Sequence, residues 1–253
     1  MKRHCPFAVG MMAVLFPTAS LAAQAAPAPA PAPAPNAVSG TVNLALVNAA
    51  GNTSVTTINA AEYFKIKPTD SRFQFEEGFS VIYGKSGDSV TAQQYKASGR
   101  VDFTLVLFFH VFAGGTWEKN AYAGINNRFE ELAGVAFRPI DIPTDLLSVE
   151  LGTAVTQKQS TLAIPDANYT AGRVAASYKH TFSTASYFQE IAEVLPDLQN
   201  TTNTLVNSET SLVAPLSTGI ALRMSYVVKF NNAPDPGFVK TDRLLSAGVQ
   251  IAF

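Results

Sequence analysis

The sequence lacks long hydrophobic runs and is poor in charge. Outside the N-terminus of its 253 residues there is no apolar stretch of about 18 residues, which excludes a protein built from transmembrane helices. Only 15% of the residues are charged, against roughly 25% in soluble domains, while 47% are hydrophobic. A chain that is apolar without apolar runs must distribute its hydrophobic residues by alternation, as β-strands do.

Cysteine and an excess of basic residues are also missing. The single cysteine, Cys5, lies in an N-terminal segment that reads as a signal peptide, so the mature chain is expected to contain no disulfide. Removing that segment takes away Lys2 and Arg3 and leaves 16 basic and 19 acidic side chains, a net charge of −3. This balance provides no electrostatic footprint for nucleic acid.

The first residues have the order of a secretory signal. Residues 1–25 contain a basic start, an apolar core from Pro6 to Pro17 and a small-residue cleavage site ending at Ala25. The core, about a dozen residues long, is short for a membrane anchor. Alternating Ala and Pro in residues 26–37 predict an extended periplasmic spacer. Residues 38–253 are then expected to form a single folded domain.

From Val38 onward, strand patterns follow one another with almost no helix pattern between them. The clearest is Gly219–Phe230, where apolar residues alternate with a face that carries Arg223, Ser225 and Lys229. About twelve such strands are predicted, and most are roughly ten to thirteen residues long. Soluble strands average about five or six residues, whereas membrane-crossing strands need about nine to eleven. Length therefore favours a closed, antiparallel transmembrane β-barrel with an up-and-down meander over a soluble sandwich.

Two segments do not fit the pattern. "TLVLFFHVF" (Thr104–Phe112) should contain a turn near Leu105–Leu107 but has no turn residues. In "YFQEIAEVL", either strand parity directs Glu190 or Glu193 toward lipid, at a cost of up to about a few kcal/mol at mid-depth. The connections alternate between short and long from Glu118 on, and an even strand count places both ends of the chain on the periplasmic side.

The alternation assigns each strand residue to one of two faces. Twelve charged residues are expected to line the lumen: Arg72, Glu76, Lys96, Arg100, Asp102, Glu130, Glu150, Arg173, Lys179, Glu209, Arg223 and Lys229. In the clearest strand the lipid-facing residues are Ile220, Leu222, Met224, Tyr226, Val228 and Phe230. The charges either line a narrow aqueous pore or pair with one another and fill the lumen. Twelve strands lie between the filled eight-stranded barrels and the open porins, so width leaves both possibilities open.

Several short motifs, in this order, resemble one family. "GNTSVTT", "LAGVAFR" with "LLSVELGTAV", "YKHTFSTASYFQE", "SLVAPLSTGIALRMSY" and "KTDRLLSAGVQIAF" are similar to the salt-induced outer membrane proteins (YdiY-like), a domain family of unknown function. The resemblance covers residues 38–253. It implies an outer-membrane barrel with no catalytic residues, and its name implies a role in osmotic or salt stress.

The C-terminus has the alternation of a closing strand. Similarity to outer-membrane barrels in general implies that Val249, Ile251 and Phe253 form the signal read by the barrel assembly machinery. The expected partners are therefore that machinery and outer-membrane lipid.

Catalytic, cofactor and metal motifs were not found, so a non-enzymatic barrel is expected. His110 and His180 are the histidines that survive signal removal. A lipid-hydrolysing barrel would require a serine beside one of them, and this function stays open as an alternative. A soluble periplasmic β-protein that binds a small ligand is the other. "GKSGDS" is glycine-rich but lacks the strand and helix context of a phosphate loop.

Overall fold

The computed structural model describes residues 36–49, 55–183, 186–200 and 202–253. In these residues the chain forms twelve β-strands and one short 3₁₀ helix, η1 (Ala121–Ala123). The strands are β1 (Asn36–Ala49), β2 (Val55–Pro68), β3 (Phe73–Ser86), β4 (Ser89–Val106), β5 (Phe109–Asn120), β6 (Ile125–Asp141), β7 (Asp145–Ser160), β8 (Ala167–Thr181), β9 (Tyr187–Pro196), β10 (Thr204–Ser217), β11 (Ile220–Asn231) and β12 (Thr241–Ala252). No helix in the described ranges is long and apolar enough to cross a membrane.

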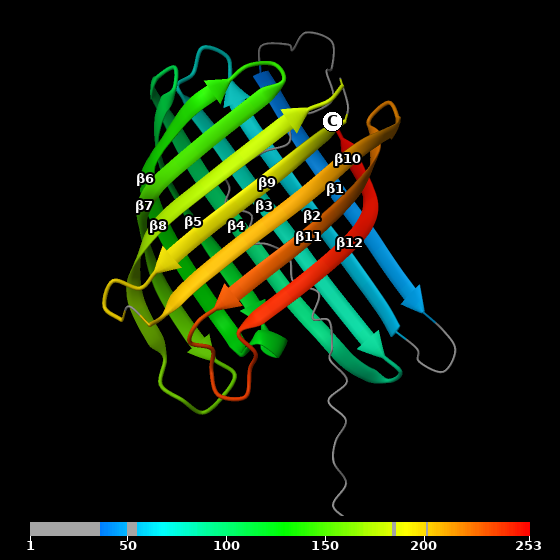
Figure 1. The fold of residues 1–253 in the computed structure, drawn as a ribbon, viewed down its shortest axis with the longest axis vertical. Coiled ribbons are helices and arrows are strands. Elements are labelled where there is room, and N and C mark those ends of the chain that lie inside the picture. Colours follow the sequence, from blue (N-terminus) through cyan, green and yellow to red (C-terminus); the bar gives the residue numbers. More distant parts are fainter. Residues whose placement is uncertain (1–35, 50–54, 184–185, 201) are drawn as a thin grey trace, which may run out of the picture.

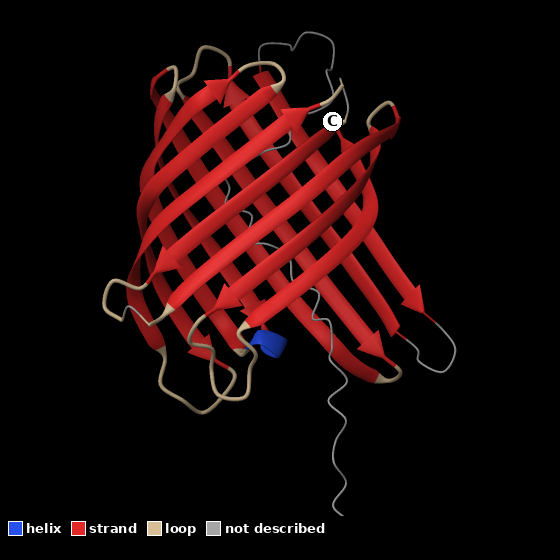
Figure 2. Ribbon diagram, viewed as in Figure 1, coloured by secondary structure: helices blue, strands red, loops and turns tan. Residues whose placement is uncertain are grey.

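The strands close into a barrel in sequence order (Figures 1 and 2). Each strand pairs antiparallel with the strands before and after it, and β1 pairs with β12. The predicted up-and-down barrel of about twelve strands is thus confirmed. The expected signal peptide and most of the spacer fall outside the described residues. Asn36 and Ala37, assigned to the spacer, belong to β1 instead, because they pair with Pro68 and Lys67.

Connections of two kinds mark the two ends of the barrel. At one end, here called the long-loop end, lie the connections 121–124, 161–166, 197–203 and 232–240. The opposite, short-turn end carries the C-terminus and is uppermost in Figure 1. Short and long connections alternate from Glu118 on, as predicted.

The apolar segment Thr104–Phe112 does contain a hairpin. β4 ends at Val106, Leu107 and Phe108 form the turn, and β5 starts at Phe109. The pairing shifts between Thr104 and Val106, so Leu105 is an extra residue on β4, a β-bulge. The bulge moves the turn slightly beyond the expected position. Leu107 is 90% exposed, and the Phe108 ring packs edge-on against Phe137.

The two glutamates of β9 lie on opposite faces. Glu193 is buried inside the barrel. Glu190 lies on the outward parity, where its carboxylate accepts hydrogen bonds from Ser208 (2.8 Å) and Thr210 (2.5 Å) on β10. The hydroxyl groups of the neighbouring strand therefore partner the outward carboxylate, and β9 needs no bulge.

The seam between β1 and β12 is short and is covered by the last residue. Only Thr41–Leu44 pair with Val249–Ala252 in the ladder. Gly40 and Phe253 exchange two backbone hydrogen bonds of 2.9 and 3.1 Å. The Phe253 ring lies over Gly40, where a Cβ atom would come within 2.8 Å of it, and packs edge-on against Phe64 at 5.6 Å. An aromatic ring thus covers a strand glycine at the point of closure.

This packing predicts an energetic coupling between Gly40 and Phe253. Gly40→Val should destabilise the refolded barrel by about 1–3 kcal/mol, because the new side chain collides with the Phe253 ring. In a Phe253→Ala background, the same substitution should cost little. The measurement is the guanidinium unfolding midpoint of the four proteins in detergent micelles. An equal cost of Gly40→Val in both backgrounds would contradict the seam packing.

Candidate functional site

The lumen contains most of the charged residues that the alternation assigned to it. Nine of the twelve are buried: Glu76, Lys96, Arg100, Asp102, Glu130, Glu150, Arg173, Lys179 and Glu209. Arg223 and Lys229 are partly buried. Arg72 does not fit the prediction, because it lies in the turn before β3 and is exposed. On the opposite face, Ile220, Leu222, Met224 and Tyr226 are 40–45% exposed, and Val228 and Phe230 are partly exposed.

A central network of ion pairs connects β4 to β9 inside the barrel. Glu150 Oε1 forms an ion pair with Arg100 Nη1 (2.9 Å), and Glu150 Oε2 accepts a hydrogen bond from Arg173 Nη1 (2.6 Å). Arg173 Nε reaches Glu193 Oε2 at 2.6 Å, and Arg100 makes two contacts with Asp102, at 2.6 and 2.8 Å. These five residues, here called the central network, are each at most 6% exposed. Every charge in this low-dielectric region therefore has an opposite charge beside it.

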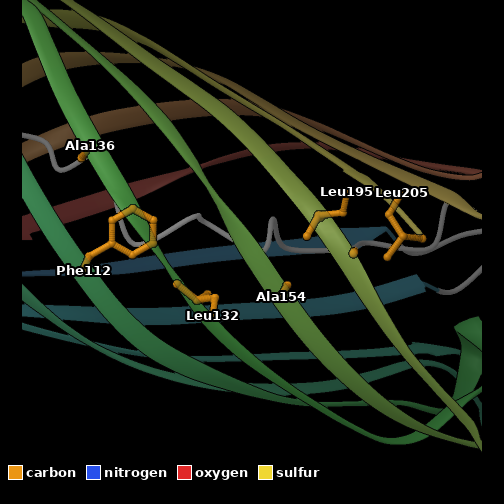
Figure 3. Close-up of a cluster of buried hydrophobic side chains, with 7 residues drawn as sticks. Phe112, Leu132, Ala136, Ala154, Leu195 and Leu205 are labelled. Carbon is orange, nitrogen blue, oxygen red and sulfur yellow. The ribbon is translucent and has the colours of Figure 1, made fainter. Parts of the chain in front are cut away.

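An apolar patch on the inner wall supports this network. The Arg100 guanidinium stacks on the Phe112 ring at 3.9 Å, a cation–π contact. The ring has room because Gly134 has no side chain: a Cβ there would lie 2.8 Å from Phe112 Cζ and would also collide with the backbone oxygen of Leu151. Figure 3 shows the patch, whose members are Phe112, Leu132, Ala136, Ala154, Ala171, Leu195 and Leu205.

Sequence reasoning missed these apolar residues of the lumen. They could have been identified from strand parity, because residues an even number of positions apart on a strand share a face. Phe112 lies six residues before Glu118, and Leu132 two residues after Glu130, so each shares a face with a charged residue. Assigning one face of each strand as apolar and the other as polar overlooks such residues. The inner wall of a narrow barrel contains apolar side chains that fill volume as well as charged ones.

A second group of charges lies near the long-loop end. Glu118 accepts hydrogen bonds from Gln94 (2.9 Å) and Lys229 (3.4 Å) and pairs with Arg128. Glu118 is on β5 and Lys229 on β11, and these strands are six places apart in the ring of twelve. The Glu118–Lys229 pair, here called the cross-lumen pair, therefore joins opposite walls of the barrel.

The β11–β12 loop (residues 232–240) folds toward the mouth at the same end. Its Asp235 accepts hydrogen bonds from Lys158 Nζ (2.8 Å) and Ser160 Oγ (2.7 Å) on β7. The Phe238 ring rests on Gly124, where a Cβ would come within 2.9 Å and where φ is 75°. Partial burial alone would raise the pKa of Asp235, but the bonds from Lys158 and Ser160 hold it below its usual value. We call the contacts of Asp235 the loop latch.

Other charges pair locally. Arg223 binds Glu209 at 2.7 Å and the side chain of Gln250 at 3.3 Å. The Lys179 ammonium lies 4.3 Å from the centre of the Tyr187 ring. The predominant chemistry of the lumen is thus charge pairing between strands, with spare donors near the long-loop end.

Comparison with known proteins adds a family to this geometry. Residues 42–253 match the family described as "Protein of unknown function, DUF481". The chain belongs to the DUF481 family. The search of curated proteins found no match.

Solved structures with a similar outline include porins and the translocator domain of an autotransporter. The NanC porin is 8% identical, with 85% of this chain and 97% of that chain covered and a TM-score of 0.47. The translocator domain of the autotransporter NalP from Neisseria meningitidis is 11% identical, with coverages of 86% and 87% and a TM-score of 0.47. The KdgM porin in complex with disordered oligogalacturonate is 10% identical, with coverages of 86% and 99% and a TM-score of 0.44. This DUF481 member is a closed antiparallel barrel, as its own strand ladder shows.

The two histidines are in different environments. His110 faces the lumen, and its Nδ1 lies 3.0 Å from Thr104 Oγ1. His180 lies on the outward parity at the short-turn end and pairs with Asp145 at 2.8 Å. Among the described residues, no serine forms a hydrogen bond with either ring, and no group of three His, Cys, Asp or Glu residues could hold a metal ion.

The central network predicts a large effect of a single neutralisation. Glu150→Gln should destabilise the refolded protein by about 3–5 kcal/mol, because Arg100 and Arg173 lose the carboxylate that they share. Asp166→Asn in the exposed β7–β8 loop is the control, with an expected effect of about 0.5 kcal/mol or less. Urea unfolding in detergent micelles measures both. Similar losses for the two variants would show that the network does not stabilise the fold.

Proposed function

We propose that this DUF481 protein is a narrow passive pore of the outer membrane that is nearly closed at rest. The observation that carries the proposal is the cross-lumen pair. Glu118 and Lys229 meet from opposite walls, so the passage at that level is limited by two charged side chains and not by backbone. Side chains of this kind can separate and admit water and small ions, whereas an apolar plug would keep the lumen dry.

The residues around this constriction support a conducting role. A barrel whose lumen served only to fill space could do so with apolar side chains, because buried ion pairs are seldom more stable than packed apolar residues of the same volume. Here the lumen instead keeps the ion pairs of the central network and additional cations near the long-loop end. Paired charges that can exchange partners provide successive weak sites for a passing ion.

Membrane location and assembly are part of the proposal. The exposed apolar outer wall, for example Leu222 and Met224, suits acyl chains, and Val249, Ile251 and Phe253 would be read by the assembly machinery. Recovery of the protein in the outer-membrane fraction, with gel migration that changes on boiling, would support this. Recovery in the soluble periplasm would contradict it. A role under salt stress, which the family resemblance implied, is tested separately by growth of a deletion strain at high salt.

Planar bilayers test the pore directly. The refolded wild type should give small conductance steps, and Asp235→Asn should raise the conductance several-fold because it releases the loop latch. The control is Asp88→Asn, an exposed aspartate in the β3–β4 turn at the same end, which should leave conductance unchanged. If neither the wild type nor Asp235→Asn conducts at any salt concentration, the pore proposal is wrong.

The latch also predicts a pH dependence. The pKa of Asp235 is lower in the folded loop than in an unfolded chain, so the latch is fully formed above the usual aspartate range and is lost as pH falls through the lowered value. Conductance should therefore stay low through mildly acidic pH and rise only below the ordinary aspartate pKa. The rise should be absent in Asp235→Asn. A rise that begins near pH 6 would point to a different group.

A further inference from the structure

A cavity lies between the barrel mouth and the β11–β12 loop. Its volume is about 70 Å³, and β5, β6, β10, β11 and the loop contribute to its wall. The share of liquid volume that one water occupies is about 30 Å³, so the cavity has room for a small polyatomic solute. The function proposed above does not say which class of solute would enter here.

The charged lining of the cavity has a positive balance. Three cations, Arg128, Lys229 and Lys240, face two carboxylates, Glu118 and Asp242. Glu118 is already shared, because it pairs with both Arg128 and Lys229 and also accepts from Gln94. A guanidinium has five N–H groups and an ammonium three, so both cations keep donors that Glu118 does not use. The net charge of +1 suits a single negative charge.

A buried donor without an acceptor points to the same ligand. Asn120 lines the cavity and is 2% exposed, and its Nδ2 has no hydrogen-bond partner among the described residues. Behind it, Lys96 is the ladder neighbour of Glu118 and is 4% exposed, and its Nζ likewise has none. An unsatisfied buried donor costs about 1–3 kcal/mol, and this cost disappears when an acceptor binds.

We propose that this cavity, here called the mouth site, binds a small monoanionic oxyanion. This inference rests on the proposed pore function and names the class of solute. Arg128 and Lys229 would provide charge-assisted hydrogen bonds, and Asn120 Nδ2 would donate a third. Because the Lys229–Glu118 contact is 3.4 Å, a long one, an anion competes with Glu118 for Lys229. Binding thereby separates the cross-lumen pair and opens the passage below the site.

Acetate and its neutral isostere acetamide test the charge requirement. Saturation-transfer NMR on refolded protein in deuterated micelles should show saturable binding of acetate and none of acetamide. Lys229→Met should weaken acetate binding by about tenfold or more, as expected for the loss of one charge-assisted hydrogen bond. Lys119→Met is the matched control: it removes one lysine at the same end, from an exposed outward position, and should change binding less than about twofold.

A second variant tests the same proposal if Lys229→Met does not refold. Asn120→Asp is nearly isosteric and places a carboxylate where the proposed donor lies, so acetate binding should be lost. Equal binding of acetamide, no acetate binding, or unchanged affinity in the variants would overturn the mouth site. Conductance and reversal potentials in a potassium acetate gradient, compared with the NMR binding data, separate the pore proposal from the mouth-site proposal. Conductance without acetate binding overturns the mouth site alone, and acetate binding without conductance overturns the pore alone.

Discussion

Closure of the strand ladder is the constraint from which the other features follow. Because β12 pairs with β1, each strand has hydrogen-bonded neighbours on both sides, and the chain has only an outer and an inner wall on which to place side chains. Side chains alternate between the walls with a period of two, so what faces outward determines what must face inward. The outer wall presents apolar residues in almost every strand. The inner wall therefore receives most of the charged strand residues.

Charge in a narrow lumen must be paired, and pairing brings distant strands together. Glu150 on β7 connects Arg100 on β4 with Arg173 on β8, and Glu118 on β5 reaches Lys229 on β11. Gly134 makes room for the Phe112 ring, and the Arg100 guanidinium of the central network lies over that ring. Small inner-wall residues such as Gly134 thus make room for the network, and they also let the inner and outer walls differ in side-chain volume.

The strand pattern predicted the fold well because its signal is local. Alternation in Ile220–Phe230 or in Leu245–Phe253 can be read without knowing any neighbour, and strand length separates a membrane barrel from a sandwich. Which charged side chains pair across the lumen could not be predicted from the local pattern. Glu118 and Lys229 are on opposite walls, and only the ring order brings them together. A turn near Leu105–Leu107 was required by the pattern, but its exact position could not be predicted, because a bulge and exposed apolar side chains replace the usual turn residues at Leu107 and Phe108.

The two glutamates of β9 show how the walls treat the same side chain differently. Glu190, on the outer wall, accepts hydrogen bonds from Ser208 and Thr210 of the adjacent strand. Glu193, three residues later on the inner wall, binds Arg173 and also accepts from Asn207, so it joins a network of several strands. Inner-wall charges instead share partners: Glu193 contacts both Arg173 and Asn207, and Arg173 also contacts Glu150, so the pairing extends over several strands.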